Sequence, residues 1–259
     1  MTKSTIPQEI KNNTSLRLNK ALAATGICSR RAADELIAAG KVMVNNLHAN
    51  PGQQVVPGVD KITVNGQPVF FEQNKEPYTY ILLHKPIQVV CTAKDPQGRE
   101  TVLDILPTQW RASRIYPVGR LDYFSEGLLL LTDDGDLTFR LTHPGWHMPR
   151  VYEVKVRGEV TNAKLASMRK GMTLQEGEVL APVEVEVKSQ LNDATVLLLT
   201  LHQGINRQIR RMCRDLDLTI LYLRRIKMGP LSLGSLEKGL ARMLSDDEVA
   251  ELRAAVGLE

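Results

Sequence analysis

No uninterrupted aliphatic stretch of this 259-residue chain is longer than four residues, the length of the leucine run Leu128 to Leu131. A membrane-spanning helix needs roughly 20 consecutive apolar residues, so this stretch is too short to cross a bilayer. Residues 1–13 are polar and contain no apolar segment of the kind that an export signal requires. We therefore expect a cytoplasmic protein whose core is built from short buried strands and amphipathic helices.

Apolar segments of strand length recur from residue 78 onward, together with segments of helical periodicity. The pattern predicts strands at 80–84, 114–118, 127–132, 152–157 and 194–201, and helices at 162–169, 206–216 and 246–254. These segments do not follow a strict strand–helix–strand alternation. The fold class that we expect for the large domain is therefore α+β, with a mixed, mainly antiparallel sheet and flanking helices.

The first 66 residues contain the signals of a separate, smaller domain. Leu18, Ala21 and Leu22 recur at helical spacing. Ser29 is a favourable N-cap for a second helix, which ends before Gly40. Two strand-like segments follow, at 41–46 and 60–66. The expected organisation is a flexible N-terminus (1–15), a small helical and strand domain (16–66), a linker (67–77) and a large domain (78–259).

The basic residues are concentrated in two places, although the formal net charge is only +4. Residues 17–41 contain five basic and two acidic side chains, and residues 202–227 contain seven basic and two acidic ones. Clusters of this kind are typical of nucleic-acid-binding surfaces. The basic residues of the first cluster are Arg17, Lys20, Arg30, Arg31 and Lys41.

Arg30 and Arg31 occupy the first turn of the predicted second helix, where the helix dipole disfavours a cation by about 0.3–1 kcal/mol. A bound phosphate would interact both with these arginines and with the free N–H groups of the helix start. The sequence therefore favours a phosphate contact at this position over the alternative, a solvated charged face.

The predicted helix at 206–216 places apolar and basic side chains on opposite faces. The apolar face comprises Ile209, Met212, Cys213 and Leu216, and the basic face comprises Arg207, Arg210, Arg211 and Arg214. No acidic residue interleaves with the arginines on that face, so their mutual repulsion must be offset from outside the helix. The partner is either a polyanion or a carboxylate elsewhere in the fold, and a merely exposed helix is the remaining alternative.

The segment Gly119-Arg-Leu-Asp122 lies between two predicted strands, so the chain turns there and presents polar side chains at a strand end. Loops held by a rigid scaffold are common locations for catalytic groups, and Asp122 is the first carboxylate to consider. An aspartate in a loop is more often a turn former. The residues alone leave both interpretations of Asp122 open.

Several motifs occur together along the chain. They are His84-Lys85-Pro86, Gly119-Arg-Leu-Asp122 followed by Ser125-x-Gly127-Leu-Leu-Leu-Leu-Thr, Leu141-Thr-His-Pro144, Tyr152-Glu-Val-Lys-Val and Gly204-Ile-Asn-Arg-Gln-Ile-Arg-Arg-Met212. With these motifs the chain resembles the ribosomal RNA pseudouridine synthases of the RsuA/RluB/RluE/RluF family. Segments 17–22, 26–31 and 40–45 resemble the small RNA-binding domain named after a ribosomal small-subunit protein.

The resemblance implies roles for three residues. Asp122 would be the catalytic aspartate that attacks the target nucleoside, and Arg210 would be its basic partner. Tyr152 would pack beside the target base and is a candidate for removing the proton from C5. Two alternatives remain open. Tyr152 can be a core residue of its strand, and Arg207 or Arg211 can pair with Asp122 while Arg210 contacts RNA.

The resemblance also implies the activity, which is isomerisation of uridine to pseudouridine in ribosomal RNA. The Asn206-Arg207 form of the arginine motif favours large-subunit over small-subunit RNA. The residues expected to contact RNA are Arg17, Lys20, Arg30, Arg31, Lys41, Arg120, Arg207, Arg211 and Arg214.

We expect a monomer with no membrane or nucleotide partner. One alternative is an RNA-binding ribosome-assembly factor without catalysis. Another is a glycosidase that uses Asp122 and Glu126, but it leaves the basic clusters unexplained.

Neither a metal nor a cofactor is expected. His143 and His147 are four residues apart, but the Pro-Gly pair between them prevents the helix that would align them as ligands. The segment 133–136 lacks the spacing of a calcium loop and predicts a turn. Because the implied isomerisation is redox-neutral, the resemblance calls for no cofactor.

Three positions depart from the family pattern. Arg150 stands where a lysine often precedes the tyrosine by two positions. Phe124 fills a position that is commonly polar, and Ile205 replaces a frequent arginine. None of the three is Asp122, so these departures bear on how the substrate is held more than on whether the reaction occurs.

Overall fold

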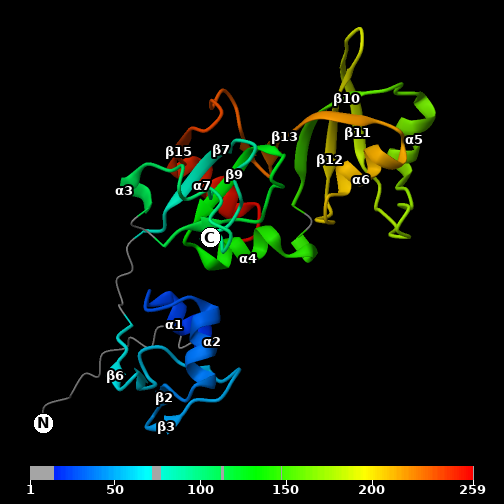
Figure 1. The fold of residues 1–259 in the computed structure, drawn as a ribbon. Coiled ribbons are helices and arrows are strands. Elements are labelled where there is room, and N and C mark those ends of the chain that lie inside the picture. Colours follow the sequence, from blue (N-terminus) through cyan, green and yellow to red (C-terminus); the bar gives the residue numbers. More distant parts are fainter. Residues whose placement is uncertain (1–14, 72–76, 112–113, 147, 259) are drawn as a thin grey trace, which may run out of the picture. The chain divides into compact units, whose positions relative to one another are not determined.

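The computed structural model describes residues 15–71, 77–111, 114–146 and 148–258. The chain forms two compact units with their boundary between Pro77 and Tyr78, and each is described by itself (Figure 1). The N-terminus that was predicted to be flexible, residues 1–15, lies outside the described residues except for Ser15.

Two short helices belong to the small domain: α1 (Leu18–Ala24) and α2 (Arg30–Ala38). Leu18, Ala21 and Leu22 of α1 are buried, which confirms the helical pattern. The hydroxyl of Ser29 accepts a hydrogen bond from the Ala32 N–H at 3.2 Å, which confirms the predicted N-cap of α2.

Short strands make up the rest of the small domain. They are β1 (Leu16–Arg17), β2 (Val42–Val44), β3 (Leu47–His48), β4 (Gln54–Val55), β5 (Ile62–Val64) and β6 (Gln67–Pro68). β1 pairs with β4, and the other four form a sheet in the order β3-β2-β5-β6. Because β6 belongs to this sheet and Val69 is buried in the domain core, the prediction that the linker begins at residue 67 is wrong. Residues 72–76 of that predicted linker lie outside the described residues.

The large domain is built on one mixed sheet. Its main path in the described residues runs β11-β12-β10-β13-β9-β7-β15, with β14 beside β13 and β8 beside β9. The strands are β7 (Tyr80–Lys85), β8 (Tyr116–Pro117), β9 (Glu126–Thr132), β10 (Arg150–Arg157), β11 (Glu184–Gln190), β12 (Thr195–Leu201), β13 (Thr219–Met228), β14 (Leu231–Ser232) and β15 (Ala241–Met243). Among the described pairings, that of β13 with β9 is parallel and the others are antiparallel. The predicted α+β class with a mainly antiparallel sheet is confirmed.

The ten-residue strand β13 joins the two halves of this sheet. It pairs with β10 along most of its length and with β9 at only two positions, Arg224 with Glu126 and Arg225 with Gly127. Gly127 has a φ of +110°, and a Cβ there would lie 2.2 Å from the carbonyl oxygen of Arg225. The two strands can approach this closely because residue 127 has no side chain.

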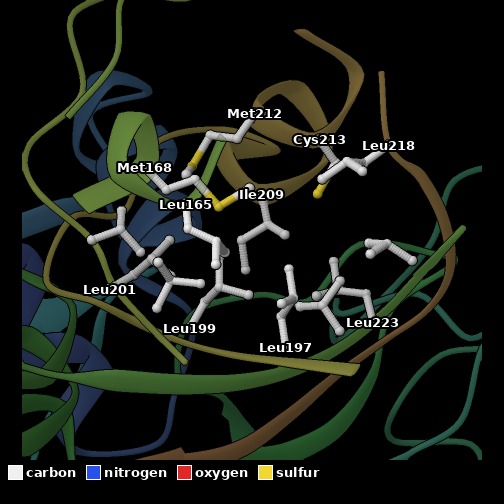
Figure 2. Close-up of a cluster of buried hydrophobic side chains, with 14 of the residues drawn as sticks. Leu165, Met168, Leu197, Leu199, Leu201, Ile209, Met212, Cys213, Leu218 and Leu223 are labelled. Carbon is white, nitrogen blue, oxygen red and sulfur yellow. The ribbon is translucent and has the colours of Figure 1, made fainter. Parts of the chain in front are cut away.

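A hydrophobic core holds helix α6 (Gln208–Asp215) against β12 and helix α5 (Asn162–Lys170). Figure 2 shows Ile209 and Met212 of α6 together with Leu197, Leu199 and Leu201 of β12. These side chains are buried, and each contributes about 1.5–3 kcal/mol relative to an exposed position. The predicted apolar face of α6 is therefore confirmed, and its burial turns the basic face away from this core.

The other helices of the large domain are α3 (Thr108–Arg111), α4 (Gly135–Thr142), the 3-10 helix η1 (Pro144–Trp146) and α7 (Asp246–Ala254). The prediction of a turn at 133–136 is wrong, because Asp134 is the N-cap of α4 and its Oδ1 accepts from the N–H groups of Asp136 and Leu137. No helix of the described segments combines the length and the apolar character that crossing a membrane requires.

The buried Asp134 carboxylate also accepts from the Tyr80 hydroxyl at 2.8 Å and from Nη1 of Arg253 at 2.9 Å. Asp134→Asn keeps the cap but places an uncharged amide against Arg253, so we expect the free energy of unfolding to fall by about 2 kcal/mol. Urea denaturation measures this change. Glu251→Gln, on the exposed side of α7, should change it by less than about 0.5 kcal/mol. Equal stability of the two variants would show that the ion pair between Asp134 and Arg253 contributes nothing to the free energy of unfolding.

Candidate active site

A cavity of about 260 Å³ lies in the large domain. Its wall is formed mainly by the segment 118–125, the start of β10, the segment 203–210 that leads into α6, and β13. Asp122, Tyr152 and Arg210, the three predicted catalytic residues, all line it. The fold thus brings together residues that lie up to 88 positions apart in the chain.

Arg210 is the arginine that pairs with Asp122. Its Nε lies 3.3 Å from Oδ2 of Asp122, and its Nη2 donates to the Phe124 carbonyl oxygen at 2.7 Å and to Ser125 Oγ at 2.9 Å. This pairing was predicted, and the alternative partners Arg207 and Arg211 make other contacts or none among the described residues. One guanidinium therefore orients both the carboxylate and the loop that carries it.

The Asp122 side chain is 32% exposed, so its carboxylate is held by Arg210 and is still open to a molecule in the cavity. Asp122 begins a turn, because its carbonyl oxygen accepts a hydrogen bond from the Ser125 N–H at 3.0 Å. The carbonyl oxygens of Asp122 and Ser125 also accept hydrogen bonds from a group inside the domain, which fixes the loop.

Lys85, at the end of β7, supplies these bonds from a fully buried position. Its Nζ donates to the carbonyl oxygens of Pro86 at 2.8 Å, Ser125 at 2.9 Å and Asp122 at 3.2 Å. Burial lowers the pKa of Lys85. Sequence reasoning named this lysine only as part of a motif, and the one available signal was a charged residue directly after a strand of apolar residues.

Tyr152 lies on β10, opposite Leu199 of β12 and Arg225 of β13. Its half-buried ring packs against the hydrophobic core shown in Figure 2 and also lines the cavity. The two interpretations that the sequence left open, core residue and site residue, therefore both describe this side chain. A ring backed by a packed core is a rigid surface for a flat ligand.

Arg120 and Arg207 are exposed and line the cavity. Arg207 is the N-cap residue of α6 and has a left-handed backbone conformation, with φ 51° and ψ 30°. This conformation is uncommon for a residue other than glycine. Two exposed cations thus border the cavity that contains Asp122.

Arg211 and Arg214 differ from the other arginines of α6. Arg211 pairs with Glu176 and Glu178, and Arg214 pairs with Glu176 and Asp215. Their charges are offset by carboxylates of the fold, which is the second possibility that the sequence left open. Two of the acidic partners, Glu176 and Glu178, come from a loop far away in the sequence, and the third, Asp215, directly follows Arg214.

In the small domain, Arg17, Arg30, Arg31 and Lys41 are exposed, and Lys20 is half-buried. Among the described residues no carboxylate pairs with Arg30 or Arg31. Both side chains stand in the first turn of α2, next to the helix dipole that disfavours them. The charges of Arg30 and Arg31 are therefore not neutralised by a carboxylate within the described part of the domain.

Glu126 does not fit the acid of a glycosidase. It is buried and forms ion pairs with Arg224 and Lys238. Burial raises its pKa, but the hydrogen bonds of these two cations outweigh that effect and hold the pKa of Glu126 below its usual value. A carboxylate that stays ionised cannot donate the proton that a leaving group needs.

No group of three or more potential metal-ligating side chains occurs in the described ranges. Nδ1 of His143 accepts a hydrogen bond from the Gly145 N–H at 3.1 Å. His147, its partner in the rejected metal pair, lies outside the described residues.

Two family models match the chain. Residues 79–215 match the model described as RNA pseudouridylate synthase, and residues 16–61 match the S4 domain. The two matches fall on the large and the small domain.

Proteins of known sequence match across both domains. The chain is 40% identical over 240 residues to ribosomal large subunit pseudouridine synthase B of Bacillus subtilis, covering 92% of this chain and 96% of that protein. It is 36% identical over 240 residues to the dual-specificity RNA pseudouridine synthase RluF of Escherichia coli K12, covering 93% and 79%. A crystal structure of a pseudouridylate synthase is 28% identical with a TM-score of 0.64, covering 92% of this chain and 99% of that one.

Proposed function

The chain belongs to the RNA pseudouridylate synthase family and carries an S4 domain, and we propose that it isomerises specific uridines of large-subunit ribosomal RNA. The observation that carries the proposal is the single cavity in which the carboxylate of Asp122, its partner Arg210 and the ring of Tyr152 lie together.

The reaction converts uridine to pseudouridine without adding or removing atoms overall. The C1′–N1 bond breaks, the uracil ring turns, C5 joins C1′, the C5 proton leaves and N1 gains a proton. Such a site needs an ionised carboxylate, a surface that retains the detached ring, and exclusion of water. In our proposal Asp122 is the carboxylate, Arg210 orients it, and Tyr152 holds the ring and offers its hydroxyl near C5.

A uridine inside folded RNA cannot reach a cavity in the protein, so the nucleotide must leave its stack. Arg120 and Arg207 border the cavity and are exposed, which suits them to contact the phosphates on either side of the extruded nucleotide. We place Arg211 and Arg214 outside this contact surface because their charges are already paired.

The choice of large-subunit RNA is supported by the Bacillus subtilis relative, whose name describes it as a synthase of the large ribosomal subunit. We infer that the protein works as a monomer, since one chain provides the carboxylate, the arginine and the tyrosine together. We also place it in the cytoplasm, because its proposed substrate is ribosomal RNA. The reaction is redox-neutral, so the proposal includes no nucleotide cofactor.

The test is release of tritium from RNA that carries tritium at uridine C5. Large-subunit and small-subunit RNA are prepared from cells in which the gene is deleted, both as free RNA and as assembling particles. We expect the wild-type protein to release tritium from large-subunit RNA at one or a few positions. Release from the small-subunit RNA alone would overturn the choice of subunit. Tight binding without release from any preparation would favour the RNA-binding assembly factor instead.

The exposed cations of α2 are expected to contact phosphate. Replacing both Arg30 and Arg31 by alanine should weaken RNA binding and reduce the slope of log K against log salt by roughly 1.4–1.8, because each lost phosphate contact accounts for about 0.7–0.9. Fluorescence anisotropy at several salt concentrations measures the slope. Lys170→Ala, an exposed cation at the end of α5, is the control and should leave the slope unchanged. An unaltered slope for the double variant would rule out phosphate contacts at this helix start.

A further inference from the structure

Besides Arg210 and the exposed Arg120 and Arg207, two more arginines line the cavity, and they lie next to Tyr152 in the sheet. Arg150 precedes Tyr152 by two residues on β10, so both side chains are on the same face of the strand. Arg225 lies directly opposite Tyr152 on β13. Both arginines line the cavity. Two arginine side chains therefore lie beside the ring of Tyr152, which in our proposal holds the target base.

Arg225 is 2% exposed, and not all of its hydrogen-bond donors have an acceptor among the described residues. Its Nε donates to the carbonyl oxygen of Leu128 at 2.8 Å. Its Nη2 is buried and has no hydrogen-bond partner among the described residues. Arg150 is half-buried, and its Nη2 donates to the carbonyl oxygen of Leu141 at 3.2 Å.

Neither arginine forms an ion pair with a carboxylate in the part of the chain that the structure describes. Arg210, Arg224 and Arg253, by contrast, each face a carboxylate. Burial is the main effect that lowers the pKa of Arg150; the nearby Tyr152 raises this pKa, and the nearby charge of Arg225 lowers it. The two cations thus disfavour each other in the free protein.

The one carboxylate that lines the cavity, Asp122, is paired with Arg210, and placing two further like charges there without an ion-pair partner costs free energy. Buried polar groups in native proteins are nearly always satisfied, so an unsatisfied one requires an explanation. A negatively charged group of the substrate would satisfy both guanidinium groups at once. The cavity therefore has the electrostatics of a site that is complete only when an anion is bound.

We propose that Arg150 and Arg225 form an oxyanion site for the uracil ring, donating to its carbonyl oxygens while the ring is detached from the ribose. The inference rests on the proposed isomerisation and assigns to it two catalytic residues. When the C1′–N1 bond breaks, its electron pair stays on the ring and spreads from N1 to O2 and O4. The same pair is available to the ring when C5 bonds to C1′, after which the C5 proton leaves and N1 is protonated. Donors fixed before the reaction stabilise charge that develops only during it.

A phosphate is the other anion that the RNA offers, and the depth of the site argues against it. Arg120 and Arg207 are exposed at the cavity, where the RNA backbone would pass, whereas Arg225 is almost completely buried. The extruded base is the part of the nucleotide that enters deepest. A phosphate contact would strengthen binding of the RNA, and a ring contact would accelerate the reaction of the bound RNA, so kinetics separates the two.

The first experiment compares wild type, Arg150→Gln and Arg225→Lys under single-turnover conditions with saturating enzyme and C5-tritiated large-subunit RNA. We expect the rate to fall about 10²–10³-fold in each variant, as for removal of an oxyanion donor, while the dissociation constant changes less than about threefold. Arg157→Gln removes an exposed charge from the far end of β10 and serves as the control, with an unchanged rate. A weaker affinity with an unchanged rate would identify a phosphate contact and overturn the proposal.

Thermal unfolding of Arg150→Gln distinguishes a catalytic from a structural role. Removing one of two repelling cations should leave the melting temperature unchanged or raise it, whereas an arginine retained for structure would lower it. A marked loss of stability in this variant, together with a proportionate loss of activity, would overturn the assignment of Arg150.

The second experiment uses a fragment of large-subunit RNA that the wild type modifies, prepared with 5-fluorouridine at the target position. Fluorine stabilises the ring anion, so breaking of the C1′–N1 bond should depend less on the arginines. Nuclease digestion and chromatography of the rearranged nucleoside measure that step. We expect the loss caused by Arg225→Lys to be at least about tenfold smaller with 5-fluorouridine than with uridine. Equal losses on both substrates would overturn the proposal, even if the variant were partly misfolded, because misfolding affects both substrates alike.

The failure of this inference is distinguishable from the failure of the proposed function. If wild type releases no tritium from any ribosomal RNA, the proposed function fails. If wild type is active and both variants match its rate, the proposed function stands and the oxyanion site fails.

Discussion

Asp122→Asn should lower the rate of uridine isomerisation by at least about 10⁴-fold, the scale seen when a nucleophile or its activating group is removed from an enzyme. The asparagine keeps the size of the side chain but has neither the negative charge nor the nucleophilicity of the carboxylate. Single-turnover release of C5 tritium measures the rate. We also expect the fold to be retained, because Arg210 keeps its bonds to Phe124 and Ser125 when the charge on Asp122 is lost.

The control is Asp193→Asn, which changes an exposed carboxylate in the turn between β11 and β12. It should leave both rate and stability unchanged. Asp122→Asn with a rate within about tenfold of wild type would remove Asp122 from the chemical step, since general electrostatic effects alone reach that size. The turn-former interpretation of this aspartate would then stand.

Gly127→Ala is expected to cost about 4–5 kcal/mol of stability, enough to unfold much of a typical domain. The added Cβ would lie 2.2 Å from the Arg225 carbonyl oxygen and 2.6 Å from its nitrogen, at the point where β9 meets β13. Neither backbone can yield without breaking the sheet. A φ of +110° adds strain for any residue with a side chain. Equilibrium denaturation, or recovery of folded protein if the variant does not refold, measures the effect.

Gly177→Ala separates the two causes. Gly177 also has a positive φ, +86°, but a Cβ there would meet no atom within 4 Å. Its replacement should cost only about 1 kcal/mol, the conformational part of the effect. If both alanine variants were equally stable, close strand approach would not be what requires glycine at position 127.

The arginine helix shows how far the sequence alone could go. Periodicity predicted a helix with an apolar and a basic face, and α6 buries Ile209 and Met212 as expected. Periodicity is a local property, so it could not say which arginine would find which partner. Glu176 and Glu178, which neutralise Arg211 and Arg214, come from a loop about 35 residues earlier.

Strand β13 was missed for a related reason. Arg224, Arg225 and Lys227 interrupt its apolar alternation, and charged residues in a central strand are unfavourable without partners. Glu126 on the neighbouring strand supplies the partner of Arg224. Arg225 is tolerated without one, and it is this residue that we assign to the chemistry. Sequence patterning failed where the site departs from ordinary core packing.

Lys85 illustrates the same limit. A lysine at the end of a strand of apolar residues is ordinarily expected at the surface, with its ammonium in water. Here it is fully buried, and the carbonyl oxygens of Asp122 and Ser125 in the active-site loop, together with that of Pro86, hold its charge. Such a role depends on the path of a loop 40 residues away, which no local pattern contains.

Mapping pseudouridines in ribosomal RNA from a gene-deletion strain tests the central claim most directly. The strain is complemented with wild type, with Asp122→Asn or with Asp193→Asn, at equal protein levels. We predict that deletion removes pseudouridine from one or a few positions of large-subunit RNA, and that wild type and Asp193→Asn restore it while Asp122→Asn does not. Restoration by Asp122→Asn, or an unchanged pseudouridine map in the deletion strain, would contradict the account.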